Sequence, residues 1–427
     1  MVGMEPAKSA TLWSDEQHRS KAAFPSRGSH HICVPFASDA HYQDCMADVS
    51  KDRRYLTEMG QQHPELFPQA LAQGYWFHDC YRLRKQAVRL RRIKLKATGA
   101  VFTVRPSFVL PYGIARTEEV EKALYLRQWG VPFEALAYVF GRNAMFWYRA
   151  GLSMGRPNLV GTTVKHAQRM PRDVVADEKI TWLGGDEVVV PTTVSGNCVL
   201  GISVATHATS AELQATSGEF KAEATAIFPA YQLRSVCTDG FQATREAWRQ
   251  LFPQVTVVLC FLHAILKLTD RCRGMLRQQV LDRAWSVDQA VSKAQFAQRL
   301  RRLGEWARTT LDGSLAQTIA KMTRQRDAFT PAYDCPQAAR TTNAVDRVHN
   351  HLDRALYTMR YCHGSQASAR LAVRAWALQW NFHPYGPRLR QDEPQRASPF
   401  ADLNGFTYHS NWLHNFLIAA SMGGSRL

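Results

Sequence analysis

Residues 236–268 constrain the fold of this chain more than any other stretch. A short apolar run ends at Asp239, and a helical segment covers residues 241–251. A second apolar run over 255–260 then leads into another helix, which contains His263. This alternation predicts a β-α-β-α unit. Asp239 stands at the C-terminal end of the first strand, where ligands and catalytic groups gather in open α/β sheets.

Three further strands precede this unit, and two tight glycine turns join them into an antiparallel meander. These strands cover residues 174–180, 188–190 and 199–204, and a helix over 211–228 follows. The order of three strands, helix, strand, helix, strand, helix predicts an α/β domain of the RNase H-like fold, a mixed sheet flanked by helices. In that topology the first and fourth strands are neighbours, so Asp177 and Asp239 meet. Glu178 points to the opposite face of its strand, and we expect it not to be a ligand.

A third acid, Asp346, lies in a predicted helix that Thr342 or Asn343 can cap. The positive end of the helix dipole favours an anion in this first turn. Carboxylates suit Mg²⁺ or Mn²⁺, and two such ions can activate a hydroxyl nucleophile and stabilise a leaving oxygen in phosphoryl transfer. Asp177, Asp239 and Asp346 are therefore the candidate catalytic residues and metal ligands. Their mutual repulsion without cations is itself an argument for metal.

The charge balance indicates a polyanionic partner. The chain has 53 Lys and Arg against 36 Asp and Glu, a formal charge of +17 and a pI near 9.7. Nucleic acid is the commonest polyanion. Residues 82–96 hold eight cationic residues and no acid, which predicts a strand or short helix that contacts phosphates, with a solvated basic face as the alternative. The candidate DNA-binding residues here are Arg82, Arg84, Lys85, Arg89, Arg91 and Arg92.

A helix-turn-helix is predicted further along the chain. Helical patterns cover residues 117–129, 133–140 and 144–151. Thr117 is expected to cap the first helix, and a tight turn at Gly141 joins the last two. The second helix of such a motif enters the major groove of DNA, so Arg142 and Arg149 are candidate DNA-binding residues. A plain helical hairpin has the same pattern.

Composition changes along the chain predict its domain organisation. We expect an N-terminal tail and helical segment over 1–80, a basic segment and helix-turn-helix DNA-binding region over 81–160, the first part of the catalytic core over 170–263, a helical insertion over 264–340, the final core helices over 341–385 and a C-terminal tail over 386–427. The insertion is basic, with 13 Lys and Arg against 6 Asp and Glu in residues 264–330. Contact with DNA and a structural lid both fit this segment.

Neither a membrane span nor a disulfide framework is expected. No run reaches the about 18 consecutive apolar residues that a spanning helix needs, and no secretory signal is visible at the N-terminus. Nine cysteines, without a Cys-x-x-Cys pair, suit reduced thiols in a cytosol. Five cysteine and histidine residues near the N-terminus could in principle bind zinc, but their spacings fit no standard zinc site. A structural role is therefore expected for Cys33, His41, Cys45, His78 and Cys80.

Over about residues 80–415 the chain resembles DDE-type transposases of prokaryotic insertion sequences. The resemblance rests on Ala176-Asp177-Glu178 before a glycine-turn meander, on Thr238-Asp239-Gly240, on Leu-Phe-Pro leading to Cys260-x-x-His263, and on Thr341-Thr342-Asn343-x-x-Asp346-Arg347. It implies two ions of Mg²⁺ or Mn²⁺, nicking at the ends of a mobile element and strand transfer by the freed 3′ hydroxyl. The implied neighbours of the site are Cys260, His263, Asn343 and Arg347.

The resemblance also implies partners and a location. The DNA partners would be terminal inverted repeats, read by the N-terminal helical module, and a target DNA. We expect a homo-oligomer on DNA in the prokaryotic cytoplasm, associated with the nucleoid, with no membrane partner. For Cys260 and His263, packing in the core at the start of a helix is the alternative interpretation.

The third acid departs from the family pattern. Asp346 stands where these transposases usually have glutamate, and Asp353, further along the same helix face, is the alternative third acid. Two other functions stay open. One is a catalytically inactive DNA-binding protein derived from a transposase, and the other is a different nuclease of the RNase H-like fold. The large N-terminal module and the basic insertion favour the transposase.

Overall fold

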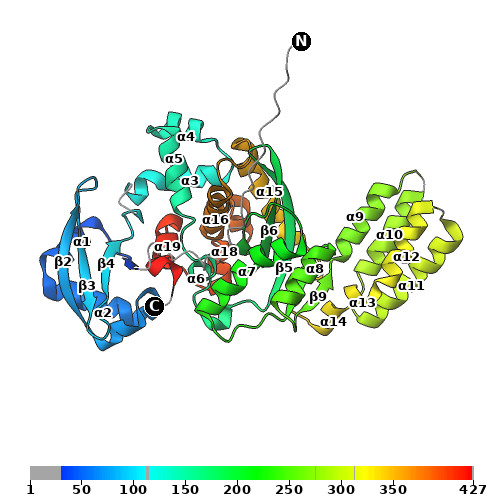
Figure 1. Ribbon diagram of the computed structural model, residues 1–427, viewed down its shortest axis with the longest axis horizontal. Helices are drawn as coiled ribbons and strands as arrows, with labels where there is room; N and C mark the ends of the chain where they lie inside the picture. The colour runs from blue at the N-terminus through cyan, green and yellow to red at the C-terminus, as the bar shows by residue number, and fades with distance from the viewer. Residues whose placement is uncertain (1–29, 112–114, 275, 312, 426–427) are drawn as a thin grey trace, which may run out of the picture.

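The computed structural model describes residues 30–111, 115–274, 276–311 and 313–425. The tail predicted at the N-terminus falls on residues 1–29, which lie outside this part. The described chain is a mixed α/β protein with a four-stranded and a five-stranded mixed sheet and many helices. Figure 1 shows the four-stranded sheet at one end of the molecule, the five-stranded sheet in the middle and a group of helices at the other end.

The four-stranded sheet comes from residues predicted as a helical segment and a basic stretch. Its strands have the order β1-β4-β3-β2, and two helices precede β2. The elements are β1 (His31–Val34), α1 (Asp39–Ala47), α2 (Val49–Gln62), β2 (Tyr75–Leu83), β3 (Val88–Leu95) and β4 (Val101–Pro106). The basic stretch therefore forms the end of β2, a turn and β3. The domain boundary predicted between residues 80 and 81 falls inside β2, so these residues belong to one sheet.

The three predicted helices before residue 155 are confirmed as α3 (Thr117–Gln128), α4 (Phe133–Phe140) and α5 (Ala144–Ser153), and the short α6 (Leu159–Thr163) follows. Thr117 does not cap α3: its hydroxyl donates a hydrogen bond to the carbonyl of Ser107 instead (2.7 Å). The guanidinium of Arg127 on α3 donates to the carbonyl of Ala355 (2.8 Å). These helices are thus tied to the rest of the protein.

The five-stranded sheet has the order β7-β6-β5-β8-β9. Its strands are β5 (Asp173–Leu183), β6 (Asp186–Ser195), β7 (Cys198–Ile202), β8 (Ser235–Thr238) and β9 (Thr256–Leu259), with α7 (Ser210–Ile227), α8 (Gln242–Leu251) and α9 (Phe261–Arg271) after β7, β8 and β9. Strands β5, β6 and β7 are antiparallel, whereas β8 runs parallel to β5 and β9. The predicted element order is confirmed.

Both faces of this sheet are covered. Successive side chains of each central strand point to opposite faces and pack into two different cores. Val174 and Val236 pack with the aromatic side chains of α7 and α8, among them Trp248. Val175 and Cys237 pack in the core that also holds the buried faces of α15 (Asn343–Thr358) and α16 (Gln366–Phe382). The sheet therefore holds the N-terminal end of α15 close to the ends of its central strands.

The predicted helical character of residues 264–340 is confirmed. The segment contains α10 (Leu276–Asp288), α11 (Lys293–Thr310), α12 (Gly313–Arg324), α13 (Arg326–Phe329) and α14 (Pro331–Asp334), which extend away from the sheet in Figure 1. Phe261 at the start of α9 packs against Phe296 and Phe329, with ring centroids 5.1 Å apart in both pairs. This separate core joins the insertion to the end of β9.

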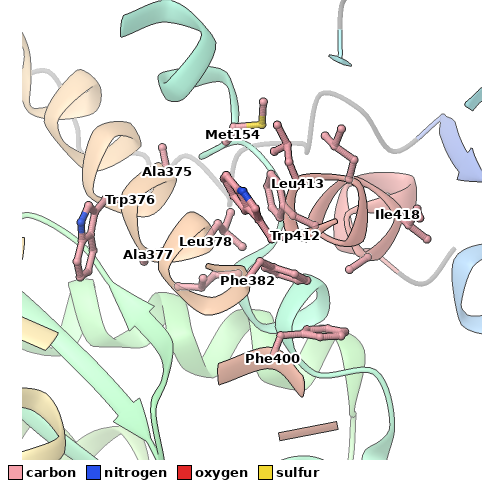
Figure 2. Packing of buried hydrophobic residues seen from close by; sticks show 14 of the residues in the cluster. Met154, Ala375, Trp376, Ala377, Leu378, Phe382, Phe400, Trp412, Leu413 and Ile418 are labelled. Carbon is pink, nitrogen blue, oxygen red and sulfur yellow. The ribbon is translucent and has the colours of Figure 1, made fainter. Parts of the chain in front are cut away.

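The prediction of a C-terminal tail over residues 386–427 is wrong. The segment forms α17 (Pro387–Asp392), α18 (Pro399–Asn404) and α19 (Trp412–Ala419), and the last of these is buried on all sides. Figure 2 shows Trp412 of α19 near Phe382 of α16, whereas Ile418 lies toward the other end of α19. Burial of each such side chain contributes about 1.5–3 kcal/mol, which fixes this segment to the core. No helix in the described residues is long and apolar enough to cross a membrane.

Candidate metal centre

Asp177 and Asp239 meet at the ends of two neighbouring strands. Strands β5 and β8 pair in parallel with Val175 opposite Cys237, and β8 ends just beyond this pair. Asp239 follows directly, and one of its carboxylate oxygens accepts a hydrogen bond from the backbone N–H of Phe241 (2.8 Å). Ligand atoms of Asp177 and Asp239 lie within 4.8 Å of each other. The predicted meeting of these two acids is confirmed.

Asp346 reaches the same place from the first turn of α15. Ligand atoms of Asp177, Asp346 and His263 all lie within 4.8 Å of one another. The alternative third acid, Asp353, forms an ion pair with Lys179 of β5 instead (2.8 Å) and belongs to neither ligand group. The structure therefore favours Asp346 over Asp353.

The prediction that Glu178 lies away from the ligands is wrong. Its carboxylate lies within 4.8 Å of those of Asp177 and Asp239, and one of its oxygens accepts a hydrogen bond from the Thr244 hydroxyl (2.7 Å). Adjacent side chains do leave a strand on opposite faces. However, β8 has already ended here, so β5 has no neighbour on that side. The β5–β8 pairing covers only Asp173 to Val175 of β5, and the Glu178 side chain extends to Thr244 of α8.

Two ligand groups thus share Asp177: one with Glu178 and Asp239, the other with His263 and Asp346. The donor set fits Mg²⁺ or Mn²⁺, which bind carboxylate oxygens and keep several waters. Four carboxylates close together also need positive charge to be ionised at the same time. These residues are therefore candidate ligands for divalent cations.

Burial and like charge change the protonation of these acids. Burial, together with the nearby carboxylates of Asp239 and Asp346, raises the pKa of Asp177 to about 6. Burial and the Asp177 carboxylate raise the pKa of Glu178 to about 8. Burial also raises the pKa of Asp346. Without a cation, this site retains protons at a pH where exposed carboxyls have lost theirs.

The Cys-x-x-His pair lies directly behind the acids. The Cys260 thiol is buried and accepts hydrogen bonds from the backbone N–H of Thr342 (3.3 Å) and from its hydroxyl (3.5 Å). Nδ1 of His263 lies 3.0 Å from the same hydroxyl. The neighbouring Cys260 sulfur, with the carboxylates of Asp177 and Asp346, raises the pKa of His263 to about 9. His263 is therefore a site neighbour, whereas the Cys260 side chain packs in the core.

A cavity opens beside Asp177, Glu178 and Asp239. Its wall includes Ile180 and Phe241, two residues that are 58% and 44% exposed. The acids therefore stand at an open surface that a large substrate can reach.

The six candidate DNA-binding residues of the basic stretch do not share one environment. Arg91 is buried and forms an ion pair with Asp52 of α2, so the prediction that it contacts DNA is wrong. Leu90 and Arg91 are adjacent in β3 and both are buried, a pattern that simple alternation does not predict. Arg92 is half-buried and forms an ion pair with Asp79. The remaining four are exposed on the hairpin: Arg82, Arg84, Lys85 and Arg89.

The other predicted site residues lie on the surface. Arg142 and Arg149 are exposed, and Arg142 lies 3.4 Å from the carboxylate of Glu119. Asn343 and Arg347 are exposed at the start of α15, on either side of Asp346 in the sequence. Within residues 30–111, the cysteines and histidines considered for zinc do not gather into a group of metal ligands.

Comparison of the chain with known protein families and with curated proteins found no match. The geometry of the site therefore carries the functional argument.

Proposed function

We propose that this protein is a DNA transposase that uses Mg²⁺ or Mn²⁺ to cleave DNA at the ends of a mobile element and to join those ends to target DNA. The observation that carries the proposal is the convergence of Asp239 and Asp346 on Asp177 from three separate elements. The strand order β7-β6-β5-β8-β9, with an antiparallel meander and two parallel strands, supports an RNase H-like core.

Asp177, Glu178, Asp239 and Asp346 would hold the cations and fix their positions relative to the DNA. Bound cations would neutralise phosphate charge, activate the attacking hydroxyl and stabilise the leaving 3′ oxygen. Asp177 belongs to both ligand groups, so its carboxylate sets their relative position. The open cavity beside Asp239 leaves room for a DNA strand. Catalysis would then consist mostly of positioning and charge stabilisation, as in other phosphoryl transfers.

The excess of positive charge supports binding to DNA. The formal charge is +17, and Arg82, Arg84, Lys85 and Arg89 are exposed on the β2–β3 hairpin. Such residues add affinity for phosphates without reading sequence. The helices α3 to α5 supply the region proposed to recognise terminal inverted repeats. Joining two element ends requires two active sites, so we propose a homo-oligomer on DNA in the prokaryotic nucleoid.

The test uses DNA that carries the gene with its flanking sequence. The purified protein is incubated with this DNA and Mg²⁺ or Mn²⁺, and new 3′ hydroxyl ends are mapped. The proposal predicts cleavage at inverted repeats, and loss of cleavage with retained DNA binding in Asp239→Asn. Binding without cleavage by the wild-type protein would indicate an inactive derivative. Cleavage of any RNA–DNA hybrid without preference for ends would indicate another nuclease of this fold.

A further inference from the structure

The two ligand groups around Asp177 differ in their chemistry. Glu178 and Asp239 complete one group with carboxylates alone, whereas the other includes the imidazole of His263 together with Asp346. Mg²⁺ prefers oxygen ligands and gives up its waters reluctantly. Imidazole nitrogen suits transition ions much better than it suits Mg²⁺. The two groups therefore offer sites of different selectivity.

The surroundings of His263 hold its ring in place. Nδ1 of His263 lies 3.0 Å from the Thr342 hydroxyl, and this hydroxyl is 3.3 Å from a carboxylate oxygen of Asp346. Thr342 is fully buried, and it precedes the first residue of α15. A single anchored residue therefore positions both the imidazole and the carboxylate. Metal-ligating histidines usually have such a partner, which fixes the ring orientation.

We propose that His263 is a metal ligand that makes its group selective for a first-row transition ion such as Mn²⁺, while the all-carboxylate group accepts Mg²⁺. This inference rests on the proposed function, because it assigns a selectivity to the same candidate site. His263 is then the residue that determines the metal specificity of one position. The imidazole would bind the cation in its neutral form, as a donor beside the carboxylates of Asp177 and Asp346.

Binding of Mn²⁺ to the metal-free full-length protein tests the inference without any DNA. Free Mn²⁺ is measured by electron paramagnetic resonance during titration, with and without a large excess of Mg²⁺. The wild-type protein is expected to bind Mn²⁺ at two positions, of which Mg²⁺ displaces only one. His263→Ala should lose the position that resists Mg²⁺, with Mn²⁺ binding there weakened more than about tenfold, since even an outer-shell partner is worth about that much.

Three variants separate the outcomes. Asp239→Asn should lose the position that Mg²⁺ displaces and keep the resistant one. His263→Gln restores an oxygen donor, so Mn²⁺ should bind again but be displaced by Mg²⁺. His207→Ala is the matched control, because His207 lines the same cavity and belongs to neither group. Circular dichroism checks that each variant is folded.

The inference and the proposed function can fail separately. A resistant Mn²⁺ position that persists in folded His263→Ala would overturn the inference, even if DNA cleavage depends on the three aspartates. Absence of any Mn²⁺ position that resists Mg²⁺ would overturn it as well. Loss of the resistant position in His263→Ala, in a protein that never cleaves DNA, would support the inference and reject the transposase.

Discussion

Glu178→Gln isolates the electrostatics of the site from its chemistry. Glutamine has nearly the shape of glutamate, and its carbonyl can still accept the hydrogen bond from Thr244. Burial, opposed by this hydrogen bond, raises the pKa of Glu178 from its ordinary value of 4.5 to about 8. The unfolded chain therefore loses this proton near pH 4.5, and the metal-free folded protein near pH 8. The stabilising contribution is complete below pH 4.5 and is lost as the pH rises through 8.

The size of the effect follows from the two pKa values. Each pH unit between them changes the free energy of unfolding by about 1.4 kcal/mol. The slope is smaller close to either pKa, so between pH 5 and pH 8 the metal-free wild-type protein should lose about 3–4 kcal/mol more stability than Glu178→Gln. Asp177, whose pKa is raised to about 6, changes stability in the same direction in both proteins and cancels in the comparison.

Urea unfolding followed by circular dichroism, with EDTA present, measures this difference at pH 5 and pH 8. Glu187→Gln is the matched control, because Glu187 is exposed and lines the same cavity. Its pH dependence should equal that of the wild-type protein. The account of the site electrostatics is refuted if Glu178→Gln and the wild-type protein lose stability equally, or if the control variant changes the pH dependence as much.

Three further predictions concern other parts of the protein. Arg91→Ala should destabilise the protein by about 3–5 kcal/mol in thermal or urea unfolding, because it leaves the buried carboxylate of Asp52 without its partner. A loss of stability below about 1 kcal/mol would contradict the burial of this ion pair. Arg89→Ala should leave stability unchanged and reduce the salt slope of DNA binding by about 1. Fluorescence anisotropy at several salt concentrations measures this slope. An unchanged slope would mean that the β2–β3 hairpin does not contact DNA. Mg²⁺ should raise the melting temperature more at pH 8 than at pH 5. The pKa values of the site carboxyls are raised, so cations compete with protons for them at acid pH. An equal increase in melting temperature at pH 5 and pH 8 would mean that Mg²⁺ binds elsewhere.

The five-stranded sheet was predictable from the sequence because its elements are regular and close in the chain. Strand β8, helix α8 and strand β9 follow one another with clear changes of period, and the acid Asp239 stands at a strand end. The order of the elements then predicts that β5 and β8 are adjacent strands in the sheet. Asp346 could be placed only through its motif, because a helical insertion separates it from the sheet.

The four-stranded sheet was not predictable in the same way. Strand β1 has four residues and pairs with β4 far along the chain, with His31 opposite Thr103. The alternation of β2 is broken by a register shift between Phe77 and Asp79. The burial of Arg91 depends on Asp52, which belongs to a helix much earlier in the sequence. Such long-range pairs leave no local pattern.

Two site residues were also misjudged or left open for physical reasons. Glu178 was excluded by strand alternation, which ignores how far a long side chain can extend beyond the last residues that β5 and β8 pair. His263 was recognised from its spacing to Cys260, but the spacing alone does not tell whether the ring faces the acids. The contact with Thr342 decides its orientation.

The most direct test of the central claim is DNA cleavage by the protein and by single Asp→Asn variants at the three acids and at Asp353. End-labelled DNA with the flanks of the gene is incubated with Mn²⁺, and cleavage is measured beside DNA binding. The account predicts that Asp177→Asn, Asp239→Asn and Asp346→Asn bind DNA but no longer cleave it, whereas Asp353→Asn cleaves as the wild-type protein does. Cleavage that survives in Asp346→Asn and is lost in Asp353→Asn would contradict the account.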